Sequence, residues 1–226
     1  MKLFLSSYRF GSKPQRFRDL TEEGSAIAVI AAAADAWPAS ARASGVVSDV
    51  VPLQRMGYEA REVDLRDHIG DPDSLAERLK PFQAVWVRGG NTFVLRAQLA
   101  RSGADTVIGR RVAENSLVYA GYSAGACVAA PTLVGLDSSD DPAEVRPTCR
   151  VDPLWDGLGF VDFSIVPHFP DTGAGDSTAA AESVPVLGDL TETGHTVAAL
   201  RAAGIEYRTL TDDEAIVVDS DGVHVE

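Results

Sequence analysis

The chain has 226 residues and a formal net charge of −13 at pH 7, and 45% of its residues are hydrophobic. This length suits one large α/β domain or two small ones, with enough chain to bury a core. The excess of acidic residues argues against nucleic acid and anionic membrane surfaces as partners, because both attract basic proteins.

Short apolar runs alternate with helical segments along most of the chain. Strands are predicted over 3–6, 27–33, 59–64, 84–87, 117–120, 163–166, 207–210, 215–219 and 223–225. Helices are predicted over 14–20, 41–56, 72–79, 92–102, 105–114, 124–130 and 196–203. The alternation indicates an α/β fold with a doubly wound, mostly parallel sheet and helices on both faces. The last two strands predict a C-terminal hairpin.

Two segments between these elements are expected to be irregular. Residues 135–147 are polar and acidic and predict a loop over the candidate site. Residues 171–193 are rich in Gly, Ser, Thr and Ala and predict a mobile segment. Neither has the character of a linker between domains, so we expect residues 1–226 to form a single domain.

The first residues lead directly into a strand, so no signal peptide is expected, and no stretch is apolar for long enough to cross a bilayer as a helix. The two cysteines, Cys127 and Cys149, lack the spacing of metal ligands, and so few thiols are typical of a reduced, cytoplasmic protein. With no ligand cluster and no dinucleotide fingerprint, we expect neither a metal nor an organic cofactor.

The motif Gly121-Tyr122-Ser123-Ala124-Gly125 lies between an apolar strand and an alanine-rich helix. A strand, a tight turn and a helix around one Ser are typical of a nucleophile elbow, which exposes the Ser Oγ above the edge of the sheet. The glycines let the strand and helix pass close together. The alternative is a tight turn that buries an inert Ser.

A nucleophilic Ser needs a general base, and the chain has four histidines. We favour His168, because it directly follows the strand at 163–166, and residues just past the carboxyl ends of strands line the ligand crevice of doubly wound folds. His68 and His195 are expected to face solvent. His224 lies in the last strand and is the second choice.

The run Gly89-Gly90-Asn91 also follows a strand end. Consecutive glycines allow the backbone to approach a substrate, and their N–H groups can face an anion. The N–H of Gly90 would then form a two-donor oxyanion hole with that of Ala124, and we count Asn91 among the candidate substrate-binding residues. The alternative is a flexible turn between strand and helix.

Three segments in this order and spacing resemble the dipeptidase E and cyanophycinase family of serine peptidases: Arg88-Gly89-Gly90-Asn91-Thr92-Phe93, Gly121-Tyr122-Ser123-Ala124-Gly125-Ala126 and Pro167-His168-Phe169. The resemblance extends over nearly the whole chain. It implies a flavodoxin-like fold similar to that of class I glutamine amidotransferases, with Ser in place of their Cys. It also implies that Ser123 is the nucleophile, His168 the base, and Gly90 and Ala124 the oxyanion donors.

The family often places its third catalytic residue, an acid, just before the penultimate strand. Counting back from Ile216 puts Asp212 at that position, with Asp213 and Glu214 as close rivals. One alternative is that all three are turn residues in water. Asp140 and Asp141, in the loop after the elbow helix, are a second candidate pair for the acid, unless they contact the substrate instead.

Four residues are candidates for binding the substrate. Arg88 stands where the family often has Gly, so its guanidinium would either reach the mouth of the site and hold a carboxylate or lie at the surface. Asp140 and Asp141 would pair with the α-amino group of a peptide, and Asn91 is the fourth candidate. No Lys or Arg occurs between Phe169 and Leu200, which leaves a preference for N-terminal Asp open.

We therefore predict a serine-type peptidase that hydrolyses short peptides, as a dipeptidase, through a Ser-His-acid triad, as a monomer or homodimer. One alternative is an esterase of the α/β-hydrolase type. Such enzymes run in the order Ser, acid, His, so His224 would be the base. The other alternative is an amidotransferase-like domain that binds a small ligand without turnover.

Overall fold

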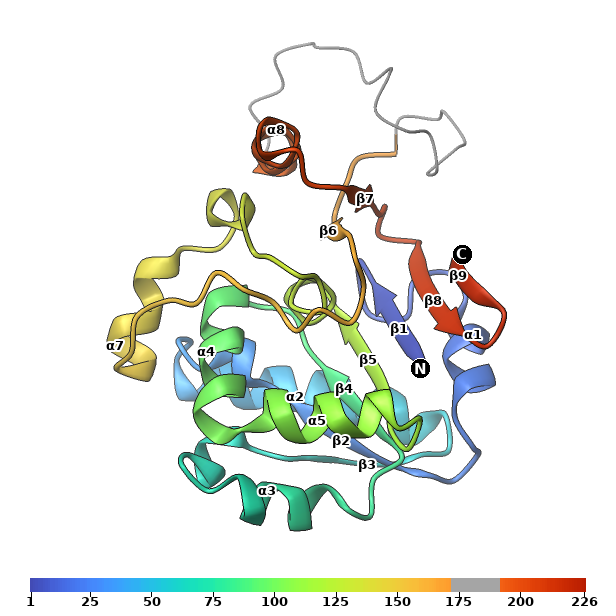
Figure 1. The fold of residues 1–226 in the computed structure, drawn as a ribbon. Coiled ribbons are helices and arrows are strands. Elements are labelled where there is room, and N and C mark those ends of the chain that lie inside the picture. Colours follow the sequence, from blue (N-terminus) through green and yellow to red (C-terminus); the bar gives the residue numbers. More distant parts are fainter. Residues whose placement is uncertain (172–191) are drawn as a thin grey trace.

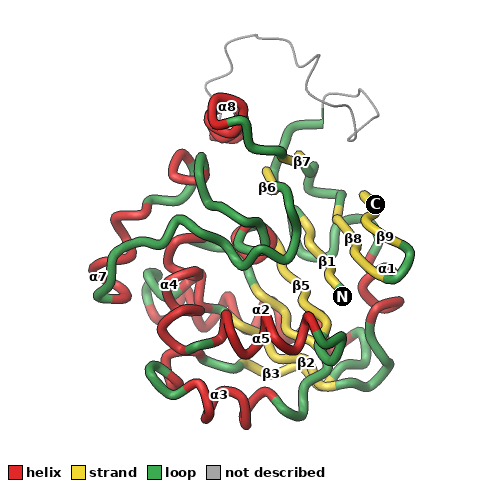
Figure 2. Tube along the Cα trace, viewed as in Figure 1, coloured by secondary structure: helices red, strands yellow, loops and turns green. Residues whose placement is uncertain are grey.

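A computed structural model of the chain describes residues 1–171 and 192–226. Its main sheet has seven strands in the order β3-β2-β4-β5-β1-β8-β9 (Figures 1 and 2). The first five in this order run parallel, whereas β8 is antiparallel to β1 and forms a hairpin with β9. The strands are β1 (Leu3–Ser6), β2 (Ala26–Ile30), β3 (Glu59–Glu62), β4 (Ala84–Val87), β5 (Val118–Tyr122), β8 (Ala215–Asp219) and β9 (Gly222–Val225).

A second, two-stranded parallel sheet pairs β6 (Ser164–Val166) with β7 (Tyr207–Thr209). In Figure 1 it lies above the main sheet, together with α8. The α-helices are α1 (Pro14–Leu20), α2 (Ala39–Arg55), α3 (Pro72–Leu79), α4 (Thr92–Ser102), α5 (Ala104–Ala113), α6 (Ala124–Cys127), α7 (Val145–Cys149) and α8 (Glu192–Ala203). The 3₁₀ helices are η1 (Ala32–Ala34), η2 (Leu65–His68), η3 (Leu136–Ser138) and η4 (Pro142–Glu144).

The side chains of the strands alternate between two cores, as the pleat of a sheet requires. Leu3 and Leu5 of β1 join one core, which includes residues of α3, α4 and α5. Phe4, between them, joins the other core with Phe17 and Leu20 of α1 and with Leu53 of α2. Helices therefore cover both faces, and the predicted α/β, doubly wound and mostly parallel fold with its C-terminal hairpin is confirmed.

Several predicted boundaries were wrong where an apolar run continues past the end of an element. The strand predicted over 27–33 ends at Ile30, because the alanines after it turn into η1. The helix predicted over 124–130 is regular only as far as Cys127. A mobile segment was expected over 171–193. Residues 172–191 of that segment lie outside the residues that the structure describes.

The segment 135–147, expected to be a loop over the site, contains η3, η4 and the start of α7. Its buried residues Leu136 and Val145 pack in one apolar cluster with Phe93 and Val94 of α4. Asp141 caps η4, and Glu144 and Asp140 accept hydrogen bonds from Asn91 and Thr92 at the start of α4, which hold the segment against that helix.

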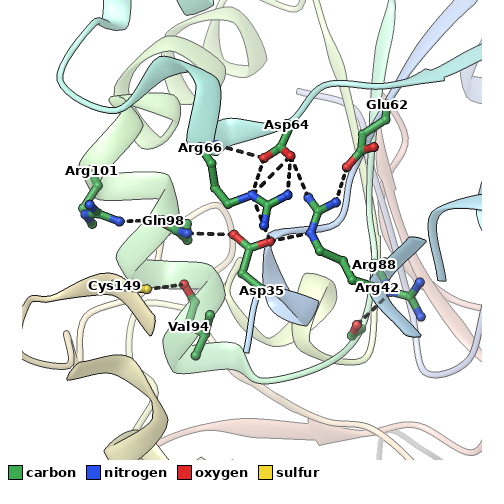
Figure 3. Close-up of polar contacts among 11 residues, drawn as sticks. Asp35, Arg42, Glu62, Asp64, Arg66, Arg88, Val94, Gln98, Arg101 and Cys149 are labelled. Carbon is green, nitrogen blue, oxygen red and sulfur yellow. Dashed lines mark hydrogen bonds and ion pairs between the residues drawn. The ribbon is translucent and has the colours of Figure 1, made fainter. Parts of the chain in front are cut away.

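A cluster of charged side chains fixes η1 beside the sheet (Figure 3). Asp35 directly follows η1, its side chain is only 1% exposed, and it accepts hydrogen bonds from Arg42 Nε and Gln98 Nε2, both at 2.7 Å. Arg42 also pairs with Asp64 at 3.3 Å. The cluster joins η1 to α2 and α4, and the carbonyl of Ala33 in η1 in turn accepts the backbone N–H of Asn91 at 2.9 Å.

Candidate active site

Ser123 occupies the turn between β5 and α6 with φ 51° and ψ −119°, a backbone conformation that non-glycine residues rarely adopt. Its N–H donates to the carbonyl of Ser6 at 3.1 Å. A Cβ on Gly121 would lie 2.3 Å from the carbonyl oxygen of Gly125, and one on Gly125 would lie 2.1 Å from that of Val87. Only glycine fits at these two positions, which is the geometry that a nucleophile elbow requires.

His168 lies two residues after the end of β6 and brings its ring to the elbow. Its Nε2 is 3.0 Å from Ser123 Oγ, and its Nδ1 is 2.6 Å from Asp212 Oδ1. An ionised carboxylate can only accept, so Nδ1 carries the proton and Nε2 is free to accept the hydroxyl proton of Ser123. This tautomer is the one that a general base needs.

Asp212 lies in the turn between β7 and β8 and is the member of its acidic run that reaches His168. The carboxylate of Glu214 instead accepts the backbone N–H of Thr211 at 2.7 Å. Asp213 contributes its carbonyl, which accepts from Ser12. The side chains of Ser123, His168 and Asp212 are thus connected in the same Ser-His-acid order in which they occur along the chain.

The turn after β4 runs beside the nucleophile. A Cβ on Gly89 would lie 2.9 Å from Ser123 Cβ and 3.3 Å from Ser123 Oγ. Gly90 has φ 147°, and a Cβ there would lie 2.5 Å from the carbonyl oxygen of Ala33. Among the described residues, the N–H groups of Gly90 and Ala124 have no hydrogen-bond acceptor. Both are therefore available for an oxyanion that forms next to Ser123.

Arg88 lies neither at a site mouth nor at the surface, in contrast to both expectations. Its side chain is 9% exposed, with Nη1 3.4 Å from Asp49 Oδ2 and the guanidinium 5.3 Å from the ring centre of Trp37. The reason is Gly45 of α2, because a Cβ there would lie 1.9 Å from Arg88 Nη1. The missing side chain leaves room for the guanidinium beneath α2.

The other three candidate binding residues hold the segment 135–147 against the start of α4. Asn91 caps α4 through its Oδ1, and its Nδ2 donates to Glu144 and to the carbonyl of Asp141, both at 2.9 Å. The carboxylate of Asp141 caps η4. Asp140 accepts from the N–H and hydroxyl of Thr92, and burial raises the pKa of its carboxyl despite these donors. These contacts correct the expectation that the two aspartates face a peptide amine.

Ser7 is a residue of this site that the sequence reasoning missed. Its Oγ accepts the N–H of His168 at 2.7 Å and lies 3.0 Å from Asp212 Oδ1. The available signal was its place, directly after the first predicted strand, where the carboxyl ends of parallel strands line the crevice.

The remaining histidines lie in other surroundings. His68 Nδ1 is 3.0 Å from Ser74 Oγ, and His224 Nε2 is 3.9 Å from Asp219 within the β8–β9 hairpin. The esterase alternative required His224 as the base, whereas the ring beside Ser123 is that of His168. No helix among the described residues is long and apolar enough to span a membrane, and those residues contain no group of three or more His, Cys, Asp or Glu arranged for a metal ion.

A model of peptidase family S51 matches residues 16–225. Peptidase E of Streptomyces coelicolor is 36% identical over 138 residues, which cover 56% of this chain and 53% of that protein. An uncharacterized peptidase of Listeria innocua is 33% identical over 117 residues, or 52% of this chain and 53% of that one. A Drosophila melanogaster protein named "Probable alpha-aspartyl dipeptidase" is 32% identical over 124 residues, or 50% and 48%. The chain spans about half the length of the curated relatives it matches.

Among solved structures, a peptidase E candidate from Listeria monocytogenes EGD-e superposes with a TM-score of 0.75 at 23% identity, over 100% of this chain and 97% of that one. A peptidase from an acI-B1 actinobacterium gives a TM-score of 0.67 at 17% identity, over 100% and 86% of the two chains. At these identities the likeness establishes the fold alone.

Proposed function

The chain belongs to peptidase family S51, and on that premise we propose that it hydrolyses short peptides, dipeptides above all, with Ser123 as nucleophile. The proposal is carried by the unbroken contacts from Ser123 Oγ through both ring nitrogens of His168 to Asp212, at 3.0 and 2.6 Å. Such a relay makes a hydroxyl nucleophilic, because the imidazole removes its proton as the new bond forms. Since the relay joins residues from widely separated parts of the chain, we also propose that residues 1–226 act as one domain.

In the proposed acylation step, His168 Nε2 takes the proton of Ser123 Oγ while that oxygen attacks the scissile carbonyl carbon. The carbonyl oxygen becomes an oxyanion, which accepts hydrogen bonds from the N–H groups of Gly90 and Ala124. Asp212 stabilises the imidazolium and keeps the ring in the productive tautomer. His168 then gives its proton to the departing amine, which leaves an acyl-enzyme on Ser123.

Deacylation repeats these steps with water in place of the hydroxyl. His168 removes a proton from the water, which attacks the acyl carbon, and then returns a proton to Ser123 Oγ. The ring of His168 is 43% exposed, which is compatible with entry of a water molecule from solvent.

The choice of dipeptides is supported by the relatives named peptidase E and probable alpha-aspartyl dipeptidase. The proposal does not require an N-terminal Asp. The guanidinium of Arg88 is already paired with Asp49, and the sequence between Phe169 and Leu200 holds no Lys or Arg. A carboxylate on the substrate would therefore need a cation other than Arg88 and outside the stretch from Phe169 to Leu200.

The test is a panel of dipeptides that differ in the N-terminal residue, Asp included, assayed for release of free amine beside labelling by a fluorophosphonate. We expect at least one dipeptide to be cut, and Ser123→Ala to lose both the labelling and roughly four orders of magnitude of turnover. Labelling without hydrolysis of any dipeptide would reject the dipeptidase but keep the serine hydrolase. A wild-type protein that is not labelled would instead favour a binding domain without turnover.

The assignment of Asp212 as the acid of the triad is tested by comparing Asp212→Asn with Asp213→Asn. The first change should lower kcat by roughly a hundredfold or more with little effect on KM, since the carboxylate is needed most when imidazolium forms. Asp213→Asn should leave kcat unchanged, because the contacts of Asp213 described above use its backbone. The reverse result would move the role of acid along the turn.

A further inference from the structure

Three separate parts of the chain converge on two consecutive serines at the end of β1. The carbonyl of Ser6 accepts the N–H of Ser123 at 3.1 Å. The hydroxyl of Ser7 lies 2.7 Å from the backbone N of His168 and 3.0 Å from Asp212 Oδ1. Both serines are fully buried. Ser6 and Ser7 together thus contact all three members of the candidate triad.

The hydroxyl of Ser7 has one proton to donate and two lone pairs with which to accept. The backbone N–H of His168 can only donate, so Ser7 accepts from it and gives its own proton to the carboxylate of Asp212. Asp212 Oδ1 also receives Nδ1–H of His168. The four groups form a closed ring of hydrogen bonds that begins at the backbone of His168 and returns to its side chain.

This ring has a geometric consequence for the base. His168 has φ 58°, in the left-handed region that costs free energy for a residue other than glycine, so it needs support from its surroundings. Ser7 supplies that support by holding the backbone N–H. Through Asp212 the same hydroxyl also limits rotation of the imidazole, so that Nε2 remains directed at Ser123 Oγ.

The sheet explains why the end of β1 is the place where this happens. β1 pairs with β5, in a register that sets Ser6 beside Tyr122, and on its other edge with β8, which sets Ser6 beside Ala215. Ser7 continues the second pairing by donating its N–H to the carbonyl of Glu214 at 3.2 Å. Its hydroxyl therefore lies between the elbow and the turn that carries Asp212.

We propose that Ser7 is a positioning residue of the hydrolase, which holds His168 and Asp212 in register with Ser123 through a single hydroxyl group. The inference rests on the proposed function, since it assigns a role in the same reaction. It adds a fourth side chain whose contribution is made through the base and the acid.

The test compares Ser7→Ala with Ser12→Ala. Ser12 is the matched control, because its hydroxyl donates at 3.0 Å to the carbonyl of Asp213, beside Asp212 in the same turn. Ser7→Ala should lower kcat and the rate of fluorophosphonate labelling by about ten- to a hundredfold, the effect of losing one hydrogen bond to a charged group. KM should stay near the wild-type value, whereas the unfolding midpoint should fall modestly, because the N–H of His168 loses its acceptor. Ser12→Ala should change none of these.

A double-mutant cycle separates positioning from a general loss of structure. If Ser7 acts through Asp212, then Ser7→Ala made on top of Asp212→Asn should cost less than about threefold further. Equal costs in both backgrounds, or wild-type labelling by Ser7→Ala, would overturn the inference while the hydrolase itself stood. Absence of labelling in the wild-type protein would overturn the proposed function and the inference together.

Discussion

At the scale of single residues, the candidate site depends on backbone conformations that only particular residues permit. Ser123 and His168 both have positive φ, and two such residues within hydrogen-bond distance of each other must be held by their neighbours. Gly121 and Gly125 provide the space that allows the elbow to form. The chemistry of Ser123 is therefore linked to two positions that carry no side chain at all.

Gly125→Ala tests this dependence. The new Cβ would meet the carbonyl oxygen of Val87 at 2.1 Å, so β4 and the start of α6 would have to separate. We expect loss of fluorophosphonate labelling and a decrease of roughly 2–3 kcal/mol in the free energy of unfolding, measured by urea denaturation.

Gly109→Ala is the matched control for that change. Gly109 lies within α5, where the nearest atom to an added Cβ is in Phe160 at 3.7 Å, an ordinary contact. Alanine is the better helix former, so this variant should be as stable as the wild type or more stable by about 0.5–1 kcal/mol, with labelling unchanged. If Gly125→Ala behaved in the same way, the account of the elbow would be wrong.

At the scale of elements, α2 is joined to the ends of the two strands that lead into the site. Asp49 of α2 pairs with Arg88, just past the end of β4, and accepts a hydrogen bond at 3.2 Å from the hydroxyl of Tyr122, the last residue of β5. Burial raises the pKa of the Asp49 carboxyl, against the charge of Arg88 and the hydrogen bond from Tyr122, which lower it. A costly buried carboxylate thus fixes the spacing between the glycine turn and the elbow.

Asp49→Ala should therefore destabilise the protein by about 3 kcal/mol, measured by chemical denaturation, because it leaves the guanidinium of Arg88 buried without its partner. Asp49→Leu combined with Arg88→Met should recover much of that loss, because an apolar pair removes both charges. Glu77→Ala is the control. Its pair with Lys80 is mostly exposed, so no measurable change is expected. If Asp49→Ala were as stable as the wild type, the Asp49–Arg88 pair would not be what fixes the ends of β4 and β5.

At the scale of the whole molecule, the most general property is the formal net charge of −13. A field of one sign slows the approach of ligands of that sign, and dissolved salt screens it. The kcat/KM of an acidic dipeptide should therefore rise severalfold between about 10 mM and about 300 mM salt, while that of a neutral zwitterionic dipeptide changes less than about twofold. A fall in kcat/KM for the acidic peptide would instead indicate a cationic subsite that dominates its binding.

The features that could be predicted from sequence are those encoded locally. The elbow around Ser123 is contained in the five residues from Gly121 to Gly125, and His168 is marked by its place directly after a predicted strand. Asp212 was singled out from its acidic neighbours only through the resemblance to a known family. Arg88 could not be placed in this way, because its position is decided by Gly45 and Asp49, which lie on a helix about forty residues earlier in the chain. Ser7 carries the local signal of following a predicted strand, but its role depends on His168 and Asp212, which are 161 and 205 residues away.

The place of Asp212 along the chain has a consequence for the protein while it is being made. Ser7, Ser123 and His168 leave the ribosome before Asp212 does, and the turn that carries Asp212 is fixed only when β8 pairs with β1 on the free edge of the parallel sheet. Until that pairing forms, the growing chain has a nucleophile without an oriented base. Hydrolytic activity should therefore stay low during synthesis and reach its full level only after β8 has paired with β1, so that the nascent chain does little to the peptides around it.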